Sequence, residues 1–175
     1  MNLSPAVQKY VLHWGEMGTR WGTNRTVAQI QALLYLSPTP LRADEIVELL
    51  SVARSNVSTS IRELQSYGLV KMIHVLGDRR DYFESIYDVW DLFRAIIEQR
   101  KQRELNPTLS MLRDCAALID TEKETDDVTK DRIRNMLKFF ETTSDWYEQI
   151  QELPTPTLQK IMKLGRGITK VIAKA

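Results

Sequence analysis

Apolar residues recur at helical spacing along the N-terminal part of the chain. Ser4-Pro5 predicts a helix start, because serine caps a helix and proline is favoured at the first helical position. A second amphipathic helix is expected from about Asn24. Three glycines between the two predict that the first helix is interrupted: Gly15, Gly18 and Gly22.

The next segment predicts two short helices joined by a tight turn. Ser37-Pro38-Thr39-Pro40 ends the preceding helix, and Ala43–Leu50 reads as a short amphipathic helix. Ser51-Val52-Ala53 is the connection, and the following helix stops near Gly68. Four residues predict the buried side of that second helix: Val57, Ser60, Ile61 and Leu64.

A β-hairpin is expected after Gly68. The run from Leu69 to Val75 is short and β-branched, Gly77-Asp78 is a turn signal, and Tyr82–Ser85 supplies a second strand. Two helices, a tight turn and a hairpin in this order predict a winged helix-turn-helix, in which the second helix is suited to the DNA major groove.

Every segment from Tyr87 onward has helical periodicity. We expect breaks at Asn106-Pro107, at 121–127 and at 154–156. The fold class predicted is mainly α: a winged helix-turn-helix domain with a small β-hairpin wing over 1–86, and a helical dimerisation and possible effector region over 87–175. The apolar positions expected to line the helices of that region are Val89, Phe93, Ile96, Ile97, Leu109, Leu112, Ala116, Ile119, Ile133, Leu137, Phe140 and Tyr147, with Leu158, Ile161, Ile168 and Ile172 expected at a dimer interface.

The outward face of the predicted recognition helix carries hydrogen-bonding side chains. Asn pairs bidentately with adenine and Arg with guanine, whereas Ser and Thr reach bases or phosphates. An ordinary solvated helix face would carry more Glu and Lys. The DNA-binding residues predicted on this helix are Arg54, Ser55, Asn56, Ser58, Thr59 and Arg62.

The hairpin turn adds Arg79 and Arg80, where a wing meets the minor groove or the DNA backbone. Only two acidic residues, Glu63 and Asp78, lie among the five basic residues between Arg54 and Arg80. A chain of net charge +1 therefore carries a local basic surface, although it is no general polycation.

Composition excludes several classes of site. One cysteine permits neither an internal disulfide nor a cysteine-based zinc cluster, so we expect no metal and no cofactor. We find no nucleophile elbow, phosphate loop or paired-carboxylate motif, which argues against an enzyme. No signal peptide or membrane span is apparent, so a cytoplasmic protein without membrane contact is expected.

These segments resemble a known family. The pattern in Ala43–Ile46, Val57-Ser58, Gly68–Val70 and Asp78–Arg80 resembles the MarR superfamily of bacterial regulators, and His13–Gly22 with Ala32–Leu36 resembles its GbsR branch. The resemblance implies a homodimeric transcription regulator on a pseudo-palindromic operator of double-stranded DNA. It also implies that Arg80 reaches DNA, that Asp78 orients Arg80 and that Arg79 contacts a phosphate. The C-terminal extension past Lys130 departs from the broader superfamily, which leaves a ligand pocket there in question.

Two alternatives remain open from sequence. A winged helix also serves protein–protein assembly without DNA binding. A small-molecule effector such as an osmolyte or quaternary amine is a further hypothesis, since aromatic faces attract quaternary ammonium groups. The aromatic residues weighed for such a cage, against the commoner role of core packing, are Tyr10, Trp14, Trp21, Tyr35, Trp90 and Trp146.

Overall fold

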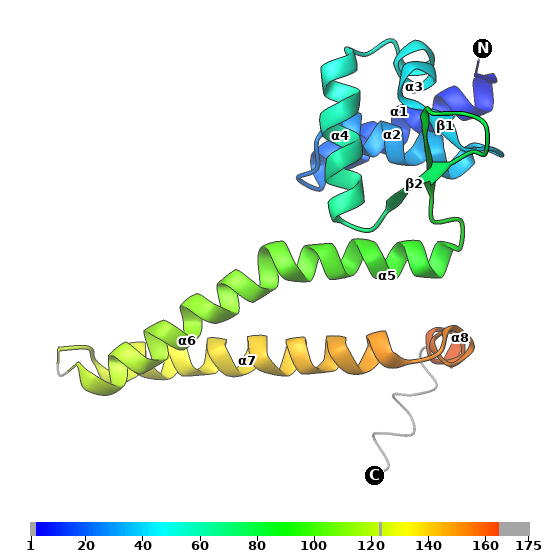
Figure 1. The fold of residues 1–175 in the computed structure, drawn as a ribbon. Helices are drawn as coiled ribbons and strands as arrows, with labels where there is room; N and C mark the ends of the chain where they lie inside the picture. The colour runs from blue at the N-terminus through cyan, green and yellow to red at the C-terminus, as the bar shows by residue number, and fades with distance from the viewer. Residues whose placement is uncertain (1–2, 123, 165–175) are drawn as a thin grey trace. The chain divides into compact units, whose positions relative to one another are not determined.

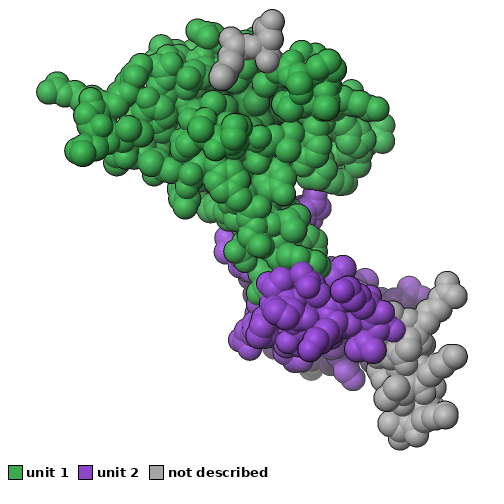
Figure 2. All heavy atoms as spheres, turned by 90° about the vertical axis from the view of Figure 1, so that its right-hand side faces the viewer, with its two compact units in different colours: residues 1–96 green, residues 97–175 purple. Residues whose placement is uncertain are grey.

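The computed structural model describes residues 3–122 and 124–164, and the chain there is mainly helical with a small antiparallel sheet (Figure 1). It forms two compact units, Met1–Ile96 and Ile97–Ala175 (Figure 2). The first unit holds the helix-turn-helix and the wing. The described part of the second unit consists of helices joined by short loops.

The first helix, α1 (Pro5–Arg20), begins where the sequence predicts, and Ser4 Oγ accepts a hydrogen bond from Val7 N–H at 3.4 Å. The expected interruption at Gly15 and Gly18 is wrong, because α1 runs through both. Both glycines are buried against the next helix, and a Cβ built on Gly18 would lie 2.4 Å from Ala28 Cβ. Glycine serves here for close helix packing and not for chain reversal.

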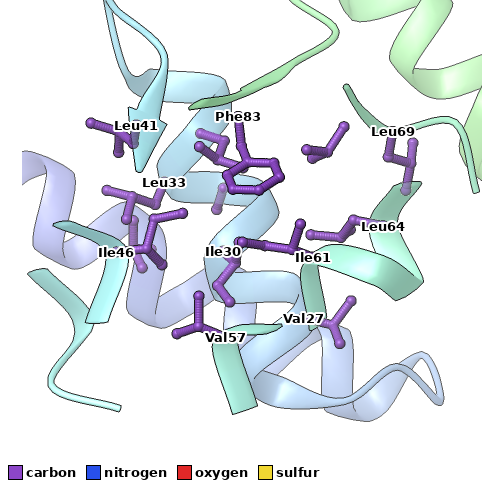
Figure 3. Close-up of a cluster of buried hydrophobic side chains, with 14 of the residues drawn as sticks. Val27, Ile30, Leu33, Leu41, Ile46, Val57, Ile61, Leu64, Leu69 and Phe83 are labelled. Atoms are coloured by element: carbon purple, nitrogen blue, oxygen red, sulfur yellow. The ribbon is translucent and has the colours of Figure 1, made fainter. Parts of the chain in front are cut away.

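Helix α2 (Arg25–Leu36) is the centre of the first unit. Asn24 caps it, accepting from Thr26 N–H at 2.8 Å, and every residue from Val27 to Leu34 is buried. Figure 3 shows Ile30 and Leu33 among side chains from the surrounding helices and the sheet. A helix buried on all sides needs neighbours on every face, and α1, α3, α4 and β3 supply them.

The helix-turn-helix follows as predicted. Helix α3 (Ala43–Leu50) is short, and Glu45 in its first turn accepts from the Arg42 backbone N–H at 2.8 Å. The turn begins at Ser51, which has a left-handed backbone with φ of 53°. Helix α4 (Arg54–Ser66) then packs on α2 through its buried face, the predicted Val57, Ser60, Ile61 and Leu64.

The wing is a three-stranded antiparallel sheet with the order β1-β3-β2. The predicted hairpin is present as β2 (Val70–His74) and β3 (Asp81–Ser85), whereas the short β1 (Leu41–Arg42) was not expected. Phe83 of β3 faces both Leu41 and Met72 in the register and is buried in the core. The hairpin is therefore held to the helical body by its middle strand.

Helix α5 (Val89–Arg100) adds a further side to the core of the first unit. Its Leu92 is buried there and Ala95 and Ile96 pack beside it, which is why the compact unit extends to Ile96, beyond the boundary at residue 86 expected from sequence. The apolar stripe predicted for this helix is partly wrong, since Val89 and Phe93 are exposed.

The second unit contains an αα-hairpin of α6 (Asn106–Thr121) and α7 (Asp127–Glu152), which lie side by side. The Arg113–Glu141 and Arg134–Asp120 pairs, at 3.2 and 2.7 Å, join the two helices. The expected break at Asn106-Pro107 is wrong. A π-helical turn, η1 (Lys101–Leu105), leads directly into α6, and this local widening accommodates a proline that cannot donate a backbone hydrogen bond.

Helix α8 (Thr155–Leu164) follows the predicted proline break. Of the residues expected at a dimer interface, Leu158 is buried within the single chain and Ile161 is half-buried. Ile168 and Ile172 lie outside the described residues. No helix in the described ranges is both long enough and apolar enough to span a bilayer.

The glycine contact between α1 and α2 leads to a stability prediction. Gly18→Ala should lower the free energy of unfolding by about 1–3 kcal/mol, the usual cost of overpacking a close contact. Glu16→Ala, at an exposed position of the same helix, should leave it nearly unchanged. Chemical denaturation of both variants is the measurement, and equal midpoints would show that α1 and α2 separate easily.

Candidate nucleic-acid interface

Helix α4 presents its polar face to solvent. All six residues predicted to contact DNA from this helix are exposed: Arg54, Ser55, Asn56, Ser58, Thr59 and Arg62. The opposite face is fixed on α2 by apolar side chains and the small Ser60. The outward side chains therefore project from a helix that is well anchored, as a positioned binding surface requires.

A groove of about 480 Å³ lies between α4, the hairpin and the start of α3. Carboxylates are fewer there than guanidinium groups, with Asp44 and Asp81 at the lining. The arginines that line this groove, called the arginine groove below, are Arg42, Arg54, Arg62, Arg79 and Arg80. An excess of fixed positive charge in a concave surface attracts phosphate groups.

The arginine groove gathers only part of the predicted site. Besides four of the arginines, it includes Ser58. Ser55, Asn56 and Thr59 are exposed on α4 but do not line the groove. Helix α4 thus carries a row facing the wing and a separate polar surface beside it, which divides the predicted residues into two groups with different surroundings.

Asp78 organises the wing turn. Its carboxylate accepts from the Arg80 backbone N–H at 3.0 Å and from Arg80 Nε at 2.8 Å, and Arg80 Nη2 also donates to it. The Tyr82 hydroxyl donates to Asp78 Oδ2 at 2.8 Å. The Arg80 guanidinium, which lines the arginine groove, is consequently held in one orientation. Whether Arg80 or Arg79 contacts DNA stays a prediction.

These hydrogen bonds shift the proton affinities of all three groups. Donation from the Arg80 side chain, then from its backbone N–H and from Tyr82, lowers the pKa of Asp78 well below that of an ordinary aspartate. The Asp78 carboxylate raises the pKa of Arg80 and, as the acceptor of its hydroxyl proton, that of Tyr82. At neutral pH, Asp78 and Arg80 are therefore charged, and the neutral Tyr82 hydroxyl donates to the Asp78 carboxylate.

Three arginines of the groove lack an acidic partner. Among the residues the structure describes, Arg54, Arg62 and Arg79 form no ion pair, although Arg62 Nε donates to Ser58 O at 3.3 Å. Lys71, which sequence placed in the same basic cluster, is paired with Glu84 at 3.0 Å. The uncompensated charge of this surface is thus concentrated on α4 and at Arg79.

Two groove residues were missed from sequence. Arg42 reaches the groove through β1, and its guanidinium is paired with Asp44 and Glu45, each at 3.2 Å. Gln65 lies on α4 at three residues from Arg62 and seven from Ser58. Helical spacing alone could have identified Gln65. Nothing local predicts Arg42, because a two-residue strand has no sequence signature.

Three of the aromatic residues considered for a cage, Tyr10, Trp14 and Trp21, pack against one another instead. Tyr10 and Trp14 stack with ring centroids 5.4 Å apart, and Trp21 meets Trp14 edge-on at 6.0 Å. Rings that cover one another offer no shared face to a cation, so this cluster fits structural packing. Within residues 3–122 and 124–164, no group of three or more His, Cys, Asp or Glu side chains is arranged to hold a metal ion.

The Asp78 network predicts a pH dependence. Because the pKa of Asp78 is lower in the folded state than in the unfolded state, its ionised carboxylate stabilises the wing fully at pH values above the unfolded-state pKa. That stabilisation is lost as the pH falls through the folded-state pKa. Titration of the Asp78 carboxyl carbon by NMR should show a midpoint below that of an ordinary aspartate. Tyr82→Phe should move it upward, because one donor is removed, whereas Tyr87→Phe should not. An ordinary midpoint in the unmodified protein would contradict the bonded wing turn.

Comparison with known proteins agrees with this architecture. Residues 21–81 match the model of a family described as the MarR family, a range that includes α2, the helix-turn-helix and most of the wing. The comparison with curated proteins found no significant match. The family match indicates a regulator rather than an enzyme.

Two solved structures are similar to the chain. A protein described as a transcriptional regulator is 19% identical, with a TM-score of 0.64 over 84% of this chain and 96% of its own. The transcriptional regulator Tm0710 from Thermotoga maritima is also 19% identical, with a TM-score of 0.37 over 80% of this chain and 90% of its own. The first likeness shows a shared fold, and the segment that matches the MarR family model, residues 21–81, contains the helix-turn-helix and most of the wing of that fold.

Proposed function

We propose that the protein is a sequence-specific DNA-binding transcriptional regulator that acts as a cytoplasmic homodimer on a pseudo-palindromic operator. The observation that carries the proposal is the arginine groove beside the polar face of α4. A recognition helix supplies base contacts, while arginines at its edge and on a wing neutralise phosphates. The family match and the solved regulator of similar fold support the same conclusion.

Helix α4 and the wing are proposed to make different kinds of contact with DNA. Side chains on the polar face, such as Asn56 and Arg62, are proposed to reach base edges in the major groove. The wing arginines are proposed to meet the DNA backbone or the minor groove, with Asp78 fixing the orientation of the Arg80 guanidinium. We further place the protein in the GbsR-like branch on the strength of the run His13–Gly22 with Ala32–Leu36.

A homodimer is supported by an uncovered apolar stripe on α7. Of the 26 residues of this helix only Ser144 is buried, although α6 packs along it. Met136, Phe139 and Trp146 are exposed, and their spacing places them on one face. A second copy of the chain that covered this face would pair the two subunits by a two-fold axis, as a pseudo-palindromic operator requires.

A small-molecule effector is proposed to bind in the second unit. A groove of about 430 Å³ there is lined by Phe140, Trp146 and Tyr147. The cations beside it are paired, Lys101 with Glu148 at 2.5 Å and Arg100 with Glu104 at 3.9 Å. A groove with aromatic walls and balanced charge suits an osmolyte or a quaternary amine better than it suits a strongly charged anion.

The division between base and phosphate contacts is tested by affinity measurements on a selected operator and on scrambled DNA across a salt series. Asn56→Ala or Arg62→Ala should lose about 1–3 kcal/mol on the operator and much less on scrambled DNA, because a bidentate base contact discriminates. Arg79→Ala should weaken binding to both and lower the slope of log affinity against log salt by about one.

Arg80→Ala differs from Arg79→Ala in that it also leaves the Asp78 carboxylate without its cation. It should therefore weaken binding to both DNAs by more than Arg79→Ala does. Equal losses on both DNAs for the Asn56 and Arg62 variants would contradict base readout by α4. Absence of any salt-sensitive binding by the unmodified protein would favour an assembly module instead.

The dimer is tested by sedimentation at micromolar concentration. The unmodified protein should sediment as a dimer, and Phe139→Asp should shift it toward monomer, because a carboxylate would be buried without a partner. Lys138→Asp places the same side chain at an exposed polar site of α7 and should leave the dimer intact. A monomeric unmodified protein would overturn the proposal, and an unaffected Phe139 variant would exclude this stripe.

A further inference from the structure

The tip of the wing carries a fully exposed leucine, Leu76. Val75 to Asp78 form a tight turn in which Asp78 N–H donates to Val75 O at 3.0 Å, and Gly77 in the third position has φ of +86°. This geometry puts Leu76 at the second position, on the outer corner of the turn. Leu76 is fully exposed, with a relative accessibility of 103%, and Val75 beside it is 45% exposed.

Exposure alone gives Leu76 no function, since single apolar side chains on a surface are common. Its position is the informative feature. The turn that presents Leu76 continues directly into Asp78 and the two arginines that line the arginine groove. Because Asp78 is bonded to Arg80 and Tyr82, the tip is held on an ordered turn. Leu76 therefore lies on the same ordered turn that leads into the two arginines proposed to reach DNA.

We propose that Leu76 enters the minor groove beside each half-site and packs against its sugar walls, as a specificity-determining contact of the wing. The inference rests on the proposed function. Apolar side chains are a known means of contact in the minor groove, where the walls present deoxyribose C–H groups. Arg79 and Arg80 neutralise the phosphates on either side, so an apolar tip meets a surface whose charge is already compensated.

A contact of this kind selects base pairs by shape. The 2-amino group of guanine projects into the minor groove, where A·T pairs present only acceptors and an open floor. A leucine at that depth would meet the amino group without being able to accept a hydrogen bond from it. Leu76 therefore favours A·T pairs under the wing, at positions that α4 does not read. This preference does not depend on salt, because it involves no phosphate.

The experiment uses the full-length protein and duplexes selected from a random pool, with the base pairs under the wing located by footprinting and varied among A·T, G·C and inosine·cytosine. Inosine lacks the 2-amino group, so inosine·cytosine has the minor groove of A·T and the major-groove pattern of G·C. The unmodified protein should bind the A·T and inosine duplexes alike and the G·C duplex on the order of tenfold more weakly.

Leu76→Ser should bind the A·T duplex on the order of tenfold more weakly than the unmodified protein, with an unchanged salt slope, and should no longer discriminate against G·C. Leu76→Ala, which keeps a small apolar side chain, should show the same loss in part. Leu12→Ser, at a half-exposed leucine of α1, is the matched control and should bind normally. Thermal unfolding verifies that each variant is folded.

The outcomes separate the two proposals. If the unmodified protein binds DNA and folded Leu76→Ser binds and discriminates as it does, the inference about Leu76 is overturned while the proposed function stands. If both discriminate between A·T and inosine·cytosine, readout under the wing occurs in the major groove and the inference is again overturned. If the unmodified protein shows no salt-sensitive DNA binding, the proposed function fails and the inference fails with it.

Discussion

The first unit depends on the burial of α2 on every face. A helix whose residues from Val27 to Leu34 are all buried has no solvent side, so each neighbour must present a matching surface. Gly18 lets α1 approach closely, and Ser60 gives α4 a small contact there. Gln31 of α2 donates to Ser85 Oγ of β3 at 3.3 Å, which fixes the wing to the same helix. The recognition helix and the hairpin are thus positioned by one common support.

This shared support allows the surface to carry charges of two kinds. Arg80 is paired with Asp78, which neutralises part of the charge of its guanidinium and fixes the orientation of that group. Arg54 and Arg79 have no acidic partner in the described ranges and keep their full charge for a ligand. Fixed donors favour geometric selectivity, whereas free cations favour affinity and rapid association. A wing that has both can approach a phosphate chain quickly and still dock in one register.

Local signals predicted most of the candidate DNA-binding part, and nonlocal packing accounts for what they missed. Periodicity identified the buried face of α4, and Gly77-Asp78 identified the hairpin turn. Gly15 and Gly18 were misread as helix breakers, because glycine also marks close packing and only a neighbouring helix decides between the two uses. Pro107 was also misread as a helix break, but a π-helical turn before it lets the helix continue into α6. Arg42 lies in the site because β1 pairs with β3, which is distant from it in the sequence.

In the second unit, α7 is mostly uncovered, because only Ser144 of its residues is buried although α6 packs along it. Most helical stability in proteins comes from burying a face, and α6 leaves the stripe around Phe139, which is 63% exposed, uncovered. Joining two copies through this stripe would make the fold of the helical unit and the pairing of two recognition helices a single event. Spacing between half-sites would then follow from helix packing at residues outside the arginine groove, because a two-fold axis repeats any geometry set at the interface. A substitution on α7 would therefore alter operator binding without touching any residue of the arginine groove.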